Sequence, residues 1–300
     1  MDERFCKVGD VELCYETFGD PGRPAVLLVM GLGTQMIGWN ADFCAELAGR
    51  GFFVIRYDNR DVGRSTRFSH VPPPNPVEIA TRRPRRPAYT LADMANDGIG
   101  LLDHLEIERA HVVGASMGGM IAQTMAASHP DRVLSLVSIM SSTGSRWSGQ
   151  PAPQILPVFL QRPARTKEEY VERIVRLFGL IGSPAYERGD DELRELAEVG
   201  WERGVDPAGF GRQLAAILAS GHRASDLKRI KAPTLVIHGK ADRLVRPSGG
   251  RATAKAIPGA QLELIEGMGH DLPRGVWPRI LDGIETTAAR AVESVPQPAA

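Results

Sequence analysis

The chain has 300 residues, of which 43% are hydrophobic and 24% are charged. This length fits one large domain, or a core with an inserted subdomain, and allows a sizeable hydrophobic core. Basic and acidic residues number 36 each, so no global field draws the chain to nucleic acid or to an anionic membrane. No uninterrupted apolar run approaches the roughly 20 residues of a membrane span. We therefore expect a small-molecule substrate, with neither nucleic acid nor a membrane as partner.

The N-terminal segment and the cysteines bear on compartment and cofactors. The start, MDERFCKVGD, has no apolar stretch, so we expect no secretory signal. Cys6, Cys14 and Cys44 have the spacing of neither metal ligands nor a redox motif, and we expect reduced cysteines in a cytoplasmic protein. Without a cluster of ligating residues, the sequence predicts no metal and no organic cofactor. Nothing in it indicates an oligomeric state.

Strands alternate with helices along most of the chain. In chain order we expect strands Val11–Phe18 and Ala25–Met30, a helix ending near Gly51, strand Phe52–Tyr57, a helix from Leu91, a strand and helix over His111–Pro130, strands Val133–Met140, Pro233–Gly239 and Gln261–Gly267, and a helix over about Val276–Arg290. Thr90 and Asp93 form a capping box where the second of these helices begins. The alternation predicts an α/β fold with a mostly parallel, doubly wound sheet.

Two stretches interrupt the alternation. Residues 141–225 lack strand patterns and contain amphipathic helical patterns, which predicts a helical cap inserted into a core made of residues 1–140 and 226–300. Residues 70–87 form a long Pro-rich stretch that we interpret as a functional or mobile loop. Its arginines, at 82, 83, 85 and 86, are interpreted as solvated charge rather than as an anion site.

The most informative segment is HVVGASMGGMIAQTMAASHP, at 111–130, which reads as a strand, Gly-Ala-Ser-Met-Gly, and a helix. In a G-x-S-x-G turn of this kind the serine lies at the apex of strained backbone, with its hydroxyl clear of the sheet. Gly114 and Gly118 lack the Cβ atoms that would collide in so tight a turn. The helix N-terminus beneath the hydroxyl favours developing negative charge. Ser116 is therefore the candidate nucleophile.

A serine nucleophile needs a base within hydrogen-bonding reach, and that base needs an orienting acid. In a doubly wound sheet such groups lie past the carboxyl ends of strands. Asp242 follows the strand Pro233–Gly239, and His270 follows the strand Gln261–Gly267. The chain order Ser, Asp, His is the order that this architecture uses. We therefore predict His270 as the base and Asp242 as its acid.

The competing assignments are weaker. The other histidines lie in core elements, in the loop or in the cap, where packing, capping and surface roles are common: His70, His104, His111, His129, His222 and His238. Asp271 neighbours His270, but adjacent side chains diverge and do not easily orient one another.

Two backbone amides are the candidates for an oxyanion hole, in which N–H groups stabilise negative charge on the reacting oxygen. The residue after the nucleophile, Met117, supplies one, and the loop after an early core strand supplies the other. That loop reads Met30-Gly31-Leu32-Gly33, and its glycines let the backbone approach a substrate closely. We choose Leu32 as the second donor.

Five motifs together resemble the α/β-hydrolase superfamily, specifically its cap-bearing branch of bacterial serine esterases. They are LLVMGLG, VIRYDNRDVGRS, HVVGASMGGMIAQ, APTLVIHGKADRLV and IEGMGHDLP, which span nearly the whole predicted core. LLVMG, RYDNRDVGRS and GMGH are also similar to the aclacinomycin methylesterase-like hydrolases. The resemblance implies the α/β-hydrolase fold and the roles already assigned to Ser116, Asp242, His270, Leu32 and Met117.

The chain departs from the family at one position and follows it at another. The family often has His-Gly where this chain has Met30-Gly31, and the backbone donor that follows should be unaffected. In RYDNRDVGRS, which is typical of the family, we expect Asp58, Arg60 and Asp61 to hold a loop by charged hydrogen bonds.

A serine at the elbow disfavours the haloalkane dehalogenases and epoxide hydrolases of this superfamily, which have an aspartate there. It predicts a carboxylic ester hydrolase that cleaves esters, including lactones, of small to medium uncharged substrates through an acyl-enzyme. Other serine hydrolase chemistries stay open as alternatives: C–C bond hydrolysis, perhydrolysis of the haloperoxidase type and acyl transfer. A small-molecule sensor with slow turnover is the alternative from another class, because function lies in the site and not in the fold.

The cap should set substrate choice, since it covers the rim where Ser116 opens. We expect a mostly apolar pocket. Trp39, just past the oxyanion loop, and Met140, just past a core strand, are the candidates for its wall. Apolar cap residues such as Trp201 and Phe210 are further candidates, although most such residues pack within the cap itself.

Overall fold

The computed structural model describes residues 2–160, 162–187 and 189–293, and its centre is an eight-stranded sheet in the order β1-β2-β4-β3-β5-β6-β7-β8. The strands are β1 (Arg4–Val8), β2 (Val11–Phe18), β3 (Ala25–Val29), β4 (Phe53–Tyr57), β5 (Ala110–Ala115), β6 (Val133–Ile139), β7 (Thr234–Gly239) and β8 (Gln261–Ile265). β2 is antiparallel to β1 and β4, and every neighbouring pair from β4 to β8 is parallel. The predicted α/β fold is confirmed, and β1 extends the sheet beyond the expected strands.

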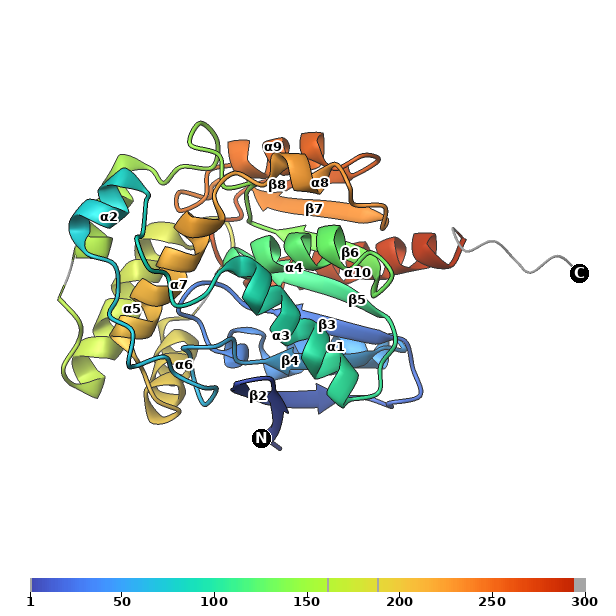
Figure 1. Cartoon of the computed structure of the whole chain (residues 1–300), viewed down its shortest axis with the longest axis horizontal. Coiled ribbons are helices and arrows are strands. Elements are labelled where there is room, and N and C mark those ends of the chain that lie inside the picture. Colours follow the sequence, from blue (N-terminus) through green and yellow to red (C-terminus); the bar gives the residue numbers. More distant parts are fainter. Residues whose placement is uncertain (1, 161, 188, 294–300) are drawn as a thin grey trace, which may run out of the picture.

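Helices cover both faces of the sheet (Figure 1). They are α1 (Ala41–Gly49), α3 (Leu91–His104), α4 (Met117–Ser128), α8 (Ala224–Leu227), α9 (Ser248–Ala256) and α10 (Trp277–Glu293), with short 3-10 turns η1 (Met36–Gly38) and η3 (Arg274–Val276). Helices α3 and α4 pack on one face, and α1 and α10 pack on the other. The predicted capping box at the start of α3 is present, because Thr90 Oγ1 accepts the Asp93 amide and the Asp93 carboxylate accepts the Thr90 amide.

The stretch 70–87 contains a helix that the sequence prediction missed. Helix α2 (Pro76–Thr81) begins at a capping box formed by Asn75 and Glu78, with Pro76 in the first turn. These local contacts satisfy the orphan amides of so short a helix and explain why it forms within a Pro-rich segment.

Residues 141–225, hereafter the inserted segment, form a helical layer at one end of the sheet, with α2 beside it (Figure 1). Their elements are η2 (Pro153–Leu160), α5 (Lys167–Ile181), α6 (Asp190–Glu202) and α7 (Pro207–Ser220), followed by α8, which crosses residue 225. The division into core and cap domains stays a prediction, and residues 294–300 of the predicted core lie outside the described residues. In the described part of the chain, every helix is too short or too polar to cross a bilayer.

Buried ion pairs fasten the inserted segment to the loop after β4. Arg203, at the end of α6, donates to Asp58, with 2.9 Å between Nη2 and Oδ2. Arg212, within α7, forms a two-pronged pair with Asp61 at 2.7 and 2.9 Å. The arginine side chains are 2% exposed and the carboxylates 0%. Separation of the segment from the loop would leave buried charges without partners, which is costly. These ion pairs therefore hold both the segment and the loop in place.

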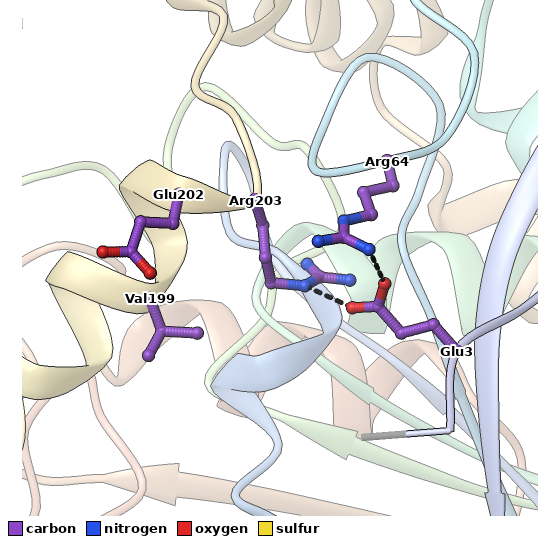
Figure 2. A pocket seen from close by; sticks show the side chains of 5 residues that line it. All are labelled: Glu3, Arg64, Val199, Glu202 and Arg203. Atoms are coloured by element: carbon purple, nitrogen blue, oxygen red, sulfur yellow. Dashed lines mark hydrogen bonds and ion pairs between the residues drawn. The ribbon is translucent and has the colours of Figure 1, made fainter.

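A third carboxylate, near the N-terminus, reinforces this junction (Figure 2). Glu3 accepts hydrogen bonds from Arg203 Nε at 2.8 Å and from Arg64 Nη1 at 2.5 Å. Together with Val199 and Glu202, these side chains line a surface hollow of about 260 Å³. Since both arginines that line it are paired with Glu3, we interpret the hollow as part of the junction.

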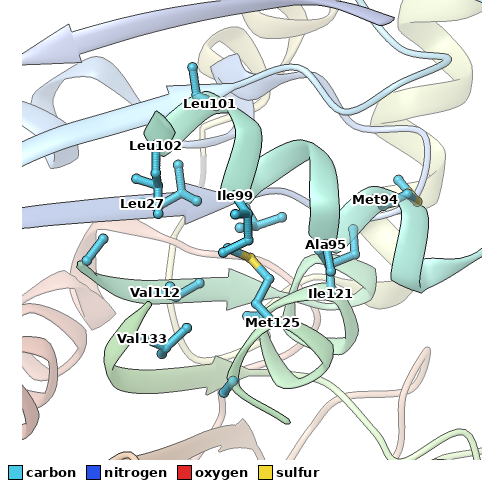
Figure 3. Packing of buried hydrophobic residues seen from close by; sticks show 14 of the residues in the cluster. Leu27, Met94, Ala95, Ile99, Leu101, Leu102, Val112, Ile121, Met125 and Val133 are labelled. Carbon is cyan, nitrogen blue, oxygen red and sulfur yellow. The ribbon is translucent and has the colours of Figure 1, made fainter. Parts of the chain in front are cut away.

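The core between the sheet and helices α3 and α4 is made of interlocking aliphatic side chains (Figure 3). Leu27 of β3 and Val112 of β5 meet Ile99 of α3 and Ile121 and Met125 of α4. All of these side chains are buried, and this packing fixes the position of α4, whose N-terminus lies at the candidate nucleophile.

We expect Met125→Ala to lower the free energy of unfolding by about 2–5 kcal/mol, because it removes buried apolar surface and leaves a cavity. The Met125 side chain lies against Gly98 of α3, so the loss falls on the α3–α4 contact. Urea unfolding measures the effect. Val77→Ala is the control, since Val77 is 70% exposed and its truncation should change stability by no more than about 0.5 kcal/mol. Equal losses in the two variants would contradict this account of the core.

Candidate active site

Ser116 lies at the turn between β5 and α4 in the strained geometry predicted for it. Its backbone has φ 57° and ψ −119°, a left-handed φ that few residues other than glycine adopt. Two contacts hold it there: its amide donates to Ile139 O at 2.9 Å, and Ser141 Oγ donates to its carbonyl at 2.8 Å. Such strain persists only where the surroundings impose it, and here β6 and the loop after it do so.

The two glycines of the elbow are required by close backbone contacts. A Cβ on Gly114 would lie 2.2 Å from Gly118 O, and a Cβ on Gly118 would lie 2.0 Å from Val29 O. Both distances are far below van der Waals contact. Any side chain at either position would push α4 away from β3 and β5, and with it the hydroxyl of Ser116.

The three predicted side chains meet at one edge of the sheet. Ser116 follows β5, Asp242 follows β7 and His270 follows β8, and these parallel strands end at the same edge. His270 Nε2 lies 3.0 Å from Ser116 Oγ, and His270 Nδ1 lies 2.7 Å from Asp242 Oδ2. A proton on Nδ1 leaves Nε2 free to accept the serine proton, which is the arrangement needed for nucleophilic attack.

Asp242 is held as a charged acceptor. Its Oδ1 accepts the amides of Leu244 and Val245, each at 2.9 Å. Burial raises the pKa of Asp242, but the charge of His270 and the hydrogen bonds from His238 and His270 outweigh burial and bring the pKa below its ordinary value of 3.8. The carboxylate therefore stays ionised near neutral pH, where it can orient and stabilise the imidazole.

His238, set aside in the sequence analysis as a histidine within a strand, lies against the acid. Its Nε2 lies 2.7 Å from Val245 O and 3.4 Å from Asp242 Oδ2. The missed signal was its position at the end of β7, four residues before Asp242. Two histidines thus face one carboxylate.

The loop with the predicted oxyanion donor lies against Ser116. A Cβ on Gly31 would lie 3.1 Å from Ser116 Cβ, so the backbone next to Leu32 approaches the serine closely. The neighbouring Gly33 amide donates to Gln213 Oε1 of α7 at 2.8 Å, which orients the loop. Met117, the other predicted donor, is the first residue of α4. The oxyanion roles of Leu32 and Met117 stay predictions.

The candidate pocket residues have different surroundings. Trp39 is 1% exposed and stacks on Phe43, with 5.6 Å between ring centroids. Met140, just after β6, is 3% exposed and has a φ of 43°. Trp201 contacts Tyr170 within the inserted segment. The pocket-wall roles of Trp39 and Met140 stay predictions. Phe210 of α7 lies against the loop that contains Leu32, since a Cβ on Gly33 would lie 2.6 Å from its ring.

The three cysteines are poor candidates for a nucleophile. Cys6, Cys14 and Cys44 are buried and free. Burial raises the pKa of Cys6 to about 11 and the pKa of Cys14 and of Cys44 to about 12, so these thiols stay protonated and unreactive near neutral pH. Among the described residues, no three histidine, cysteine, aspartate or glutamate side chains gather to hold a metal ion.

Known proteins share both the sequence pattern and the fold. A family model described as the alpha/beta hydrolase fold matches residues 24–273. Rhodomycin D methylesterase from Streptomyces sp. (strain C5) is 32% identical over 92% of this chain and 94% of its own length. A putative carbamate hydrolase from Caulobacter sp. (strain K31) is 31% identical over 86% of this chain and 88% of its own length. The crystal structure of the enol-lactonase from Burkholderia xenovorans LB400 superposes with a TM-score of 0.72, at 25% identity over 97% of this chain and all of that one.

We expect Gly118→Ala to destabilise the fold by about 1–3 kcal/mol or more and to lower activity, because the added methyl group must displace the β3 backbone. Gly179→Ala is the matched control: Gly179 lies in α5, where an added Cβ meets nothing within 4 Å. That change should be neutral or stabilise by up to about 1 kcal/mol. Thermal unfolding of both variants tests the steric argument, which fails if Gly118→Ala is as stable as the original chain.

Proposed function

Because the chain belongs to the α/β-hydrolase family, we propose that it cleaves carboxylic esters, including lactones, of small to medium uncharged substrates through an acyl-enzyme. Membership of the family and the similarity to methylesterases make it a carboxylic ester hydrolase. The observation that carries the mechanism is the hydrogen-bonded series from Asp242 through His270 to Ser116, with distances of 2.7 and 3.0 Å.

In the first half of the proposed reaction, Ser116 Oγ attacks the ester carbonyl carbon while its proton passes to His270 Nε2. Asp242 stabilises the imidazolium that forms. The amides of Leu32 and Met117 donate to the oxyanion, and each such donor is typically worth about 10²–10³-fold in rate. Collapse of the tetrahedral intermediate breaks the bond to the leaving alcohol, which takes the proton from His270.

In the second half, water attacks the acyl-enzyme and gives a proton to His270 Nε2. The second tetrahedral intermediate collapses to release the carboxylic acid, and the proton returns to Ser116 Oγ. Free serine and neutral imidazole are thereby restored, so the cycle needs no further reactant.

The proposed substrates are uncharged esters, and methyl esters are the first class to test because the similar proteins include methylesterases. The enol-lactonase neighbour supports including lactones. We propose that the inserted segment acts as the cap that selects the substrate, with Phe210 beside the oxyanion loop and with Trp39 and Met140 as wall residues. An apolar wall disfavours polyanionic substrates, whose charges would lose their hydration without a partner.

We expect Ser116→Ala to lower kcat on p-nitrophenyl butyrate by a factor on the order of 10⁶, because the nucleophile is lost. The assay is a panel of p-nitrophenyl esters, methyl esters and lactones, run on the original chain and on the variant. The mechanism would be refuted if Ser116→Ala were as active as the original chain on every substrate. Trace turnover by the original chain, together with tight ligand binding, would instead favour a sensor.

We expect log(kcat/KM) plotted against pH to show no step from Asp242 near neutral pH, because its lowered pKa keeps the carboxylate ionised there. Asp242→Asn, which keeps the side-chain shape, should lower kcat by about 10⁴-fold through the wrong imidazole tautomer. A step near neutral pH that is present in the original chain and absent in Asp242→Asn would contradict the assigned ionisation of Asp242.

A further inference from the structure

The inserted segment bonds to three consecutive residues of the loop that carries His270. Gly269 N–H donates to Ser183 Oγ at 2.8 Å, and His270 N–H donates to Ile181 O at 2.7 Å. The Ser183 hydroxyl in turn donates to the Asp271 carboxylate. Ser183 thus contacts both neighbours of His270, and the Ile181 carbonyl accepts the His270 amide.

The two segments also approach each other too closely for side chains to intervene. A Cβ on Gly269 would lie 2.3 Å from Gly182 O, and a Cβ on Gly267 would lie 2.2 Å from Ala185 Cβ. The Ala185 amide donates to Gly267 O at 3.3 Å. The loop that carries His270 therefore has little room to shift while this contact persists.

These contacts are buried, which makes their loss consequential. Ile181 is 3% exposed, Ser183 9% and Asp271 5%. The Asp271 carboxylate is buried. A hydrogen bond from a hydroxyl group therefore stabilises it more than the same bond would in water. The Ser183 hydroxyl serves as donor to one side of the base and as acceptor to the other.

The position of His270 has to satisfy two distances at once, 3.0 Å to Ser116 Oγ and 2.7 Å to Asp242 Oδ2. A displacement of about 1 Å in such an arrangement can cost on the order of 10²-fold in rate. Residues that hold the loop at 269–271 therefore affect the reaction rate, even if they do not touch the substrate.

We infer that residues 181–183 of the inserted segment position the base, and that Ser183 is a positioning residue that acts through Gly269 and Asp271. This inference rests on the proposed function. It makes the segment more than a cover over the site: α5 ends at Ile181, so a displacement of this helix would also displace His270. Substrate enclosure and alignment of the base are then coupled through one short contact.

The test is Ser183→Ala, with kcat and KM measured on p-nitrophenyl butyrate. We expect kcat to fall about 10- to 100-fold while KM changes less than about threefold, because alignment of the base is lost and the substrate contacts remain. Ser183→Thr, which keeps the hydroxyl, should recover most of kcat.

Ser220→Ala is the matched control. Ser220, at the end of α7, also bridges the inserted segment and the core, because its hydroxyl donates to Ala216 O at 2.8 Å and accepts the Leu91 amide at 3.0 Å. It lies on another part of the segment, so its loss should leave kcat within about threefold. An equal fall in both serine variants would mean that general loosening of the segment is the cause, and would overturn the inference.

The inference is also overturned if Ser183→Ala keeps kcat within about threefold or changes only KM. Should Ser183→Ala fail to fold, Asp271→Asn takes its place, because it keeps the side-chain shape and removes the charge that the Ser183 hydroxyl meets. It should lower kcat about tenfold, and unchanged kcat there would again overturn the inference. Ser116→Ala, run in parallel, separates the two proposals: activity that survives in it refutes the proposed function, whereas an inactive Ser116→Ala beside a fully active Ser183→Ala refutes this inference alone.

Discussion

The close backbone packing around Ser116 is the constraint on which the rest of the site depends. Gly118 lies so near Val29 that a Cβ there would be 2.0 Å from a carbonyl oxygen, and Gly114 is packed as tightly against Gly118. This packing lets α4 start directly beneath the serine and holds that residue at a φ of 57°. The hydroxyl then stands above the sheet edge, within 3.0 Å of His270. With a longer turn, the same residues would not meet.

The inserted segment contacts the core at the loop after β4 and at the loop that carries His270, among other places. The buried pairs Arg203–Asp58 and Arg212–Asp61 fasten its helices to the loop after β4. The contact at Ser183 joins it to the loop that carries His270. Charged pairs of this kind need good geometry to offset desolvation, so they define one orientation of the segment.

The sequence predicted the fold and the proximity of three side chains from local patterns. Ser116, Asp242 and His270 lie together because each follows the end of a recognisable strand, and neighbouring parallel strands end at the same edge. Their catalytic roles stay predictions. The sequence analysis missed a short helix and the contact of His238 with Asp242. Helix α2 is too short to show periodicity and depends on its capping box. His238 lies in a strand as predicted, but the sequence did not show that its ring nitrogen lies 3.4 Å from the Asp242 carboxylate.

The sequence by itself determined the α/β architecture, the elbow and the identity of three side chains that meet in space, because apolar periodicity, glycine spacing and strand ends are local properties. Only the tertiary structure decided which residues contact the loop that carries His270. Ser183 and Asp271 are 88 residues apart, and Arg203 and Asp58 are 145 apart. No periodicity relates positions so distant; they meet because the packed sheet brings the inserted helices over its edge, where buried polar groups must find partners.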